Sequence, residues 1–123
     1  MRSLVVAVVL WMPISVLAQN PVPSAEEIAR MRAAMPDKAR VQAEKPRKLL
    51  VFSRSWGYKH TARPYGAKAI EIMARQTGAF EAVPAEEDDS LFEPANLKQF
   101  DAVCLNNTNE EIFLPEGFAK LPQ

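Results

Sequence analysis

The sequence predicts an α/β fold built on a small parallel sheet. Two apolar runs, at residues 49–52 and 102–105, lack polar alternation, which is typical of strands buried on both faces. Helical patterns separate the predicted strands, giving the order strand, helix, strand, helix, strand. This alternation favours parallel pairing with right-handed crossovers, and we expect the spatial strand order 2-1-3.

The first 18 residues have the pattern of a signal peptide. Arg2 precedes a short apolar stretch at residues 4–12, and small residues lead to a cleavage site between Ala18 and Gln19. The apolar stretch is short for a bilayer span, and no cysteine follows it to carry a lipid anchor. We therefore expect a periplasmic or secreted protein without a stable membrane anchor. An uncleaved N-terminal anchor is the alternative.

Residues 19–46 are expected to form a short helix and a linker. Ser24 lies three residues before Glu27, which is the spacing of a capping box. Apolar residues follow at helical spacing as far as Pro36, which ends the pattern. So few apolar residues bury little area, and we expect the helix to rest on the surface. Docking to a partner is the alternative.

Residues 47–123 are expected to form the main domain. The first strand, Lys48–Ser53, leads through a polar loop to a helix over residues 64–77, with Pro64 in its first turn and Gly78 as its C-terminal cap. The later elements are a strand over residues 80–83, a solvated acidic loop over 84–90, a helix over 95–99 and a strand over 101–105.

The run at residues 101–105 is apolar, which predicts a central strand in which the lone cysteine, Cys104, is buried. A further element is expected to begin at Ile112. Three strands leave both sheet edges open, which is marginal for independent stability. We therefore expect a domain that is truncated after about three strands. An oligomer that covers the open edges is a second way to complete it.

Polar side chains follow the first and third predicted strands. In a 2-1-3 sheet these two loops meet at the switch point, where ligands of open α/β sheets bind. His60, the only histidine, is the candidate catalytic acid or base. The residues expected to bind a substrate are Ser53, Trp56, Tyr58, Asn106, Asn107 and Thr108, with Ser55 nearby.

Amide and hydroxyl groups suit sugar hydroxyls or a carbonyl oxygen, and an aromatic ring can stack on a sugar ring. Each of these residues also has a plainer interpretation. The histidine can bond to the backbone, Asn and Thr can hold a turn, and the aromatic rings can pack the loop.

Several classes of function are not indicated. The sequence lacks the glycine-rich phosphate loops G-x-G-x-x-G and G-x-x-x-x-G-K-[ST], and it lacks the nucleophile motif G-x-S-x-G. The formal net charge of +0 gives no electrostatic reason to expect nucleic acid. A single cysteine excludes an internal disulfide, and no Cys/His pattern indicates a metal. We expect neither a cofactor nor a metal.

Two stretches resemble the ThuA-like (trehalose-utilisation) family. The first is K-L-L-V-F-S-R-S-W-G-Y-K-H, followed by P-Y-G-A-K-A-I-E-I-M, where the family has a loop that ends in an aromatic residue, a basic residue and histidine. The second is L-F-E-P-A-N-L-K-Q-F-D-A-V-C-L-N-N-T. In it Phe100 replaces the usual tyrosine, and Asn107 and Thr108 fall on the family's Asn-Thr pair. The resemblance covers residues 48–109.

The resemblance implies a flavodoxin-like fold of the class I glutamine amidotransferase-like superfamily. It also implies a link to carbohydrate metabolism, especially to disaccharides such as trehalose and their keto forms. His60, Asn107 and Thr108 carry over as site residues. The glycine-rich strand and histidine loop that family members carry downstream are absent, so a complete active site does not carry over.

Whether the chain is an enzyme stays open at this point. The first interpretation is an exported ThuA-like domain that binds or transforms a sugar. The alternatives are a non-catalytic sugar-binding or interaction module and an inactive fragment. A flavodoxin-like domain that binds a nucleotide or flavin is a third interpretation, and the missing phosphate loop counts against it.

Overall fold

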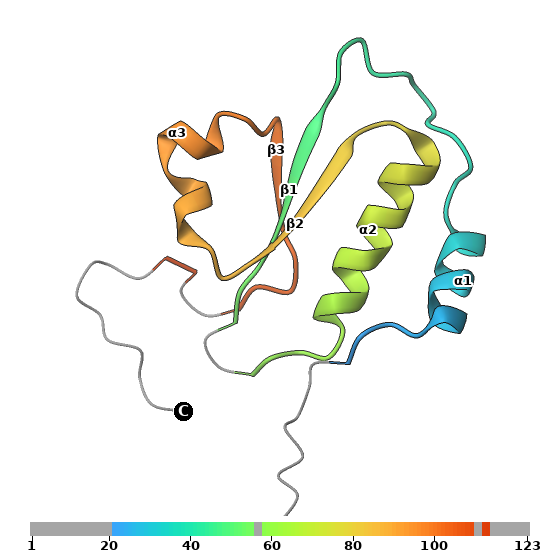
Figure 1. The fold of residues 1–123 in the computed structure, drawn as a ribbon, viewed down its shortest axis with the longest axis horizontal. Coiled ribbons are helices and arrows are strands. Elements are labelled where there is room, and N and C mark those ends of the chain that lie inside the picture. Colours follow the sequence, from blue (N-terminus) through green and yellow to red (C-terminus); the bar gives the residue numbers. More distant parts are fainter. Residues whose placement is uncertain (1–20, 56–57, 110–111, 114–123) are drawn as a thin grey trace, which may run out of the picture.

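The chain forms a mixed α/β fold, as the alternating pattern predicts (Figure 1). The computed structural model describes residues 21–55, 58–109 and 112–113. Their elements are the helices α1 (Ala25–Ala34), α2 (Arg63–Thr77) and α3 (Pro94–Leu97), the 3-10 turn η1 (Asp89–Phe92), and the strands β1 (Lys48–Ser53), β2 (Glu81–Glu86) and β3 (Ala102–Leu105). The predicted signal peptide, Trp56 and most of the element expected after Ile112 lie outside the described residues.

The three strands form one parallel sheet in the order β2-β1-β3. The predicted strand order is therefore confirmed. β1 lies in the middle, and its residues Leu50, Val51 and Phe52 have no exposed surface. An uninterrupted apolar run suits this place because both of its faces are covered.

The two faces of the sheet are covered by different elements. α2 packs against β1 and β2 on one face, with Ile72 and Ala74 buried. On the other face the Phe92 ring of η1 meets the Phe52 ring edge-on, with the centroids 4.8 Å apart. Figure 1 shows α2 and α3 on opposite sides of the strands. This is the layering that successive right-handed crossovers produce.

The two ends of α2 follow the predicted signals. Pro64 is its second residue, where a missing N–H costs nothing. Gly78 caps the C-terminus with φ of +64°, and its N–H donates to the Ala74 carbonyl. Glycine reaches this left-handed conformation without steric cost.

β2 is longer than predicted and extends to Glu86. The predicted strand ends at Val83, before Pro84, and proline has no N–H for a ladder. The N–H groups of Glu81 and Glu87 donate toward β1, to the carbonyls of Arg47 and Ser53. The backbone nitrogens of the even-numbered residues between them therefore point away from β1. Pro84 therefore lies on the free edge of the sheet, where a missing donor is tolerated.

The prediction that β3 is central and buried is wrong for the described residues. β3 is an edge strand, and α2 packs on β1 and β2 rather than on β3. Val103 is 38% exposed, Leu105 is 49% exposed, and Cys104 is half-buried. An apolar run shows that a strand can be buried, but the covering element has to come from elsewhere in the fold.

α1 lies on the outside of α2, as a separate outer layer (Figure 1). The Ser24–Glu27 capping box is present, and none of the helix residues is buried. The Tyr65 hydroxyl donates to the Glu27 carboxylate, and the Gln76 amide donates to the Arg32 carbonyl. Among the described residues, no helix is both long and apolar enough to cross a membrane.

Candidate functional site

The buried polar residues of the described chain gather at one place, the carboxyl ends of β1 and β3. They are Ser53, Arg54, Ser55, Arg63 and Asn106. A buried polar group is costly unless it is hydrogen-bonded, so a cluster of such groups requires a specific arrangement. This end of the sheet is where the sequence places the candidate site.

Asn106 joins three segments that are far apart in the sequence. Its side-chain amide donates to the Ser53 hydroxyl and to the Arg63 carbonyl, both at 2.9 Å. Its backbone N–H donates to the Phe52 carbonyl at 2.8 Å. Asn106 is only 7% exposed, so its amide N–H groups serve the fold and fix the end of β1 against the start of α2.

Gly66 makes this arrangement possible. A Cβ at Gly66 would lie 2.4 Å from the Asn106 side-chain oxygen, which is far inside contact distance. The first turn of α2 therefore comes close to the loop after β3 because residue 66 has no side chain. The helix pattern explains Pro64 and Gly78, whereas the reason for Gly66 appears only in three dimensions.

Arg54 is a buried arginine directly after β1. Its guanidinium donates to the carbonyls of Glu87 and Ile112, both at 2.9 Å, and pairs with the Asp89 carboxylate. It also lies over the Phe52 ring, 5.6 Å from the centroid. The planar fork of arginine can hold several acceptors at once, so Arg54 ties the loops after β1, β2 and β3 together.

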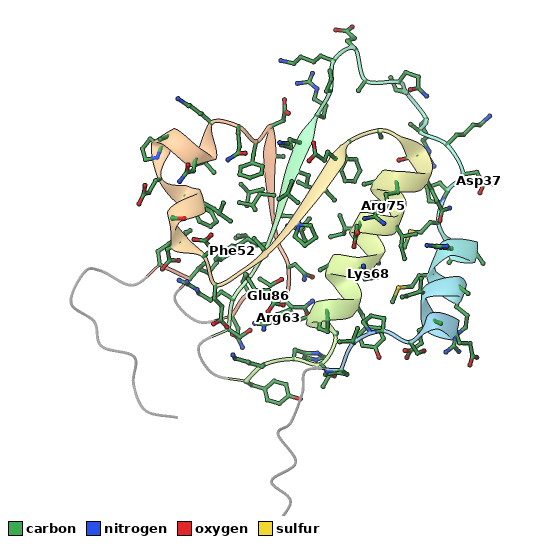
Figure 2. The ribbon with its side chains drawn as sticks, viewed as in Figure 1. Asp37, Phe52, Arg63, Lys68, Arg75 and Glu86 are labelled. Carbon is green, nitrogen blue, oxygen red and sulfur yellow. The ribbon has the colours of Figure 1, made fainter. Side chains whose placement is uncertain are left out.

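Arg63 is the second buried arginine, with 2% of its surface exposed. Figure 2 shows it beside Glu86, and the two form an ion pair at 3.3 Å. Glu87 lies 3.7 Å from Arg63 and 3.2 Å from Lys59. The acidic run after β2 is exposed, as predicted, but it also balances the positive charges of this end of the sheet.

His60 lies in the loop between β1 and α2, with an exposed side chain. Its ring Nδ1 accepts the Ala62 backbone N–H at 3.1 Å, and its carbonyl accepts the Arg63 N–H at 3.1 Å. The Tyr58 ring meets the imidazole edge-on, with centroids 5.8 Å apart. His60 therefore shapes the turn that starts α2.

The other predicted residues fall into two groups. Ser53 and Asn106 are buried and bonded to each other. Tyr58 and Asn107 are exposed and Thr108 is half-buried. Trp56 lies outside the described residues.

The loops after β1 and β3 are joined directly. Ser55 forms a parallel bridge with Asn109, and the Ser55 hydroxyl donates to the Asn107 carbonyl at 3.3 Å. The Asn109 amide donates to the Tyr58 carbonyl at 3.0 Å. Asn107 has φ of +49°, and its amide donates to the Asn106 side-chain oxygen. The structure thus brings the two predicted loops together.

Sequence reasoning missed Arg54 and Arg63. Each flanks the polar loop, Arg54 directly after the buried strand and Arg63 directly before the helix proline. An arginine at the carboxyl end of a buried parallel strand is a usable signal, because its side chain lies where several loops converge. Within the described residues, no three His, Cys, Asp or Glu side chains are grouped to hold a metal.

Two carboxylates with a clear pKa shift, Asp101 and Glu71, lie away from this site. The Arg47 guanidinium, and then the Lys48 backbone N–H, hold the pKa of Asp101 below its usual range. On α2, a hydrogen bond from Lys68 lowers the pKa of Glu71. Asp101 comes just before β3, at the opposite end of the sheet. These shifts therefore report on structural ion pairs rather than on chemistry at the candidate site.

Comparison with known proteins gives no relative from which to assign a family. No family model, no curated protein and no solved structure matches the chain significantly.

Proposed function

We propose that the chain is an exported ThuA-like, flavodoxin-like domain that binds or transforms a carbohydrate. The proposed ligand is a disaccharide of the trehalose type or a keto-sugar, bound in the crevice above β1 and β3. His60 is the proposed catalytic residue, and Asn107 and Thr108 orient the ligand. The strand order supports this placement, because β1 and β3 flank the switch point of the sheet.

One observation carries the proposal: buried polar residues hold the loops after β1 and β3 together, and other polar and aromatic side chains of the same loops are exposed to a ligand. The side chains of Arg54 and Asn106 donate their hydrogen bonds to other residues of the chain. Tyr58, His60 and Asn107 stand exposed on the two loops that this framework holds. Exposed aromatic and amide groups held on a fixed polar base can stack on a sugar ring and hydrogen-bond its oxygens.

Titration calorimetry of the chain with trehalose and with a keto-disaccharide tests this proposal. Tyr58→Ala and Asn107→Ala should each weaken binding about 3- to 10-fold, the effect expected from losing one stacking contact or one hydrogen bond. Val41→Ala, at a linker position that is 80% exposed, is the matched control. The proposal fails if neither sugar binds the wild-type chain.

If a turnover is found, His60→Ala separates a catalytic role from a binding one. A fall in kcat with unchanged affinity indicates chemistry at the histidine, and unchanged values for both indicate a structural role. The export part has its own test. N-terminal sequencing of the protein recovered outside the cytoplasm should begin at Gln19, and recovery of an intact N-terminus would refute cleavage.

A second candidate function is an interaction module. Val103 and Leu105 are exposed apolar residues on an edge strand, a combination that favours pairing with another chain. Sedimentation of the chain over a range of concentrations tests this. A mass that rises with concentration supports association, and a constant monomer mass refutes self-association.

A further inference from the structure

We infer that His60 acts as a hydrogen-bond donor through Nε2, and not as a base. The inference deepens the proposed function, because it names the group that His60 would meet on a ligand: an oxygen that accepts a hydrogen bond. It rests on the geometry of the turn between β1 and α2. The part that concerns the ring can be tested without any ligand.

The hydrogen bond from Ala62 fixes the tautomer of the neutral ring. A backbone N–H can only donate, so Nδ1, which receives it at 3.1 Å, must present its lone pair. A neutral imidazole carries a single N–H, which therefore lies on Nε2. No described residue accepts from Nε2, and the side chain is exposed, so the donor is open to a ligand.

This tautomer limits what the neutral ring can do. To act as a base, Nε2 would need its lone pair, and the proton would have to move to Nδ1, where it would face the Ala62 N–H. Two donors cannot share that position, so the turn would have to open. Donating from Nε2 requires no proton transfer: the proton stays on the ring, and the ligand oxygen gains a partner.

The surroundings keep the ring in this position. The Arg63 N–H donates to the His60 carbonyl, and the Tyr58 ring packs edge-on against the imidazole. The N-cap residue of α2, Ala62, offers no side-chain cap, and the N–H groups of Ala62 and Arg63 donate instead to the ring and the carbonyl of His60. The charged neighbours Lys59 and Arg63 are themselves paired with Glu86 and Glu87.

A donor at this place favours an oxygen that only accepts. The carbonyl oxygen of a keto-sugar is such a group and can only accept. A hydroxyl can accept from the ring N–H too, but it must first turn its own proton away from the ring. We therefore assign the keto form of the sugar as the better ligand. A neutral imidazole that polarises a carbonyl by donating a hydrogen bond to its oxygen has precedent in enzyme chemistry.

Long-range ¹H–¹⁵N correlation spectra of the ring test the assignment directly. The chain contains one histidine, so the ring signals need no assignment by mutation. At about pH 8, where an ordinary imidazole is neutral, the spectrum should show the proton on Nε2. A proton on Nδ1, or rapid averaging of the two tautomers, would overturn the inference even if a sugar binds.

Two substitutions then separate the turn from the donor. His60→Asn can still accept the Ala62 N–H in an Asx turn, but it places no donor at the Nε2 position. His60→Gln places an amide donor near that position without holding the turn. The Asn variant should keep wild-type stability and lose about 3- to 10-fold in keto-sugar affinity, while the Gln variant should keep the affinity within about 3-fold.

Equal keto-sugar binding by wild type and His60→Asn would refute the donor role. The absence of sugar binding by the wild type would refute the proposed function instead, and the ring spectrum would still decide the tautomer. The two failures are therefore distinguishable.

Discussion

Gly66→Ala should destabilise the protein, although the same change usually stabilises a helix. Gly66 lies within α2, where replacing glycine by alanine normally gains roughly 0.5–1 kcal/mol. Here the new methyl group would lie 2.4 Å from the Asn106 side-chain oxygen. Asn106 would have to move, and its two side-chain donors would leave Ser53 and Arg63.

The expected size follows from these bonds. Each contributes about 0.5–1.5 kcal/mol net, so losing both costs ~1–3 kcal/mol. After the gain in helix propensity, we expect a net loss of roughly 1–2 kcal/mol, or a Tm that is lower by about 5–10 °C. Thermal and urea unfolding followed by circular dichroism would measure it.

A double-mutant cycle gives the control. In an Asn106→Ala background the obstacle is gone, and Gly66→Ala should stabilise by roughly 0.5–1 kcal/mol, so that the two positions couple by about 2 kcal/mol. If Gly66→Ala alone raises the Tm, the close approach of α2 to the loop after β3 is wrong.

Three further predictions concern ion pairs and the sheet edge. Because Arg47 holds the pKa of Asp101 low, the pair stabilises the fold above the unfolded pKa and loses its effect as pH falls through the folded pKa. Asp101→Asn should therefore be less stable than wild type near pH 7, and in acid unfolding followed by fluorescence the difference should shrink as the pH falls through the folded pKa of Asp101. Arg54→Lys should cost about 2 kcal/mol or more in urea unfolding, since an ammonium cannot serve two carbonyls and a carboxylate as the guanidinium does; wild-type stability would contradict that role. Leu105→Lys should abolish any self-association seen by sedimentation, while Val41→Lys, also at an exposed apolar position, should leave it unchanged.

The sequence predicts the layout of the sheet because that information is local. A run of four apolar residues marks β1, and Pro64 and Gly78 mark the two ends of α2. The parallel order follows from the alternation of strands and helices. The exposure of β3 cannot be predicted locally: Val103 and Leu105 have the same apolar character as the β1 residues, yet β3 lies at an edge of the sheet and leaves them exposed.

The structure brings the two predicted loops together, and it separates their polar residues into buried and exposed ones. The sequence groups Asn106 with Asn107, yet one amide is buried between β1 and α2 while the other is exposed. Their difference depends on contacts across about 40 residues of sequence, which no local pattern encodes. The same is true of Gly66, whose reason lies in the loop after β3.

The two edges of the sheet differ in how they resist further pairing. On β2, Pro84 removes an outward donor, and Glu81 and Glu86 place charges along the strand, which are the usual means of blocking an edge. β3 has the sequence A-V-C-L, without proline or charge. If the chain associates through its sheet, the partner should therefore add to β3. Such a partner would lie next to the loop that carries Asn107, so association and ligand binding at the crevice should influence each other.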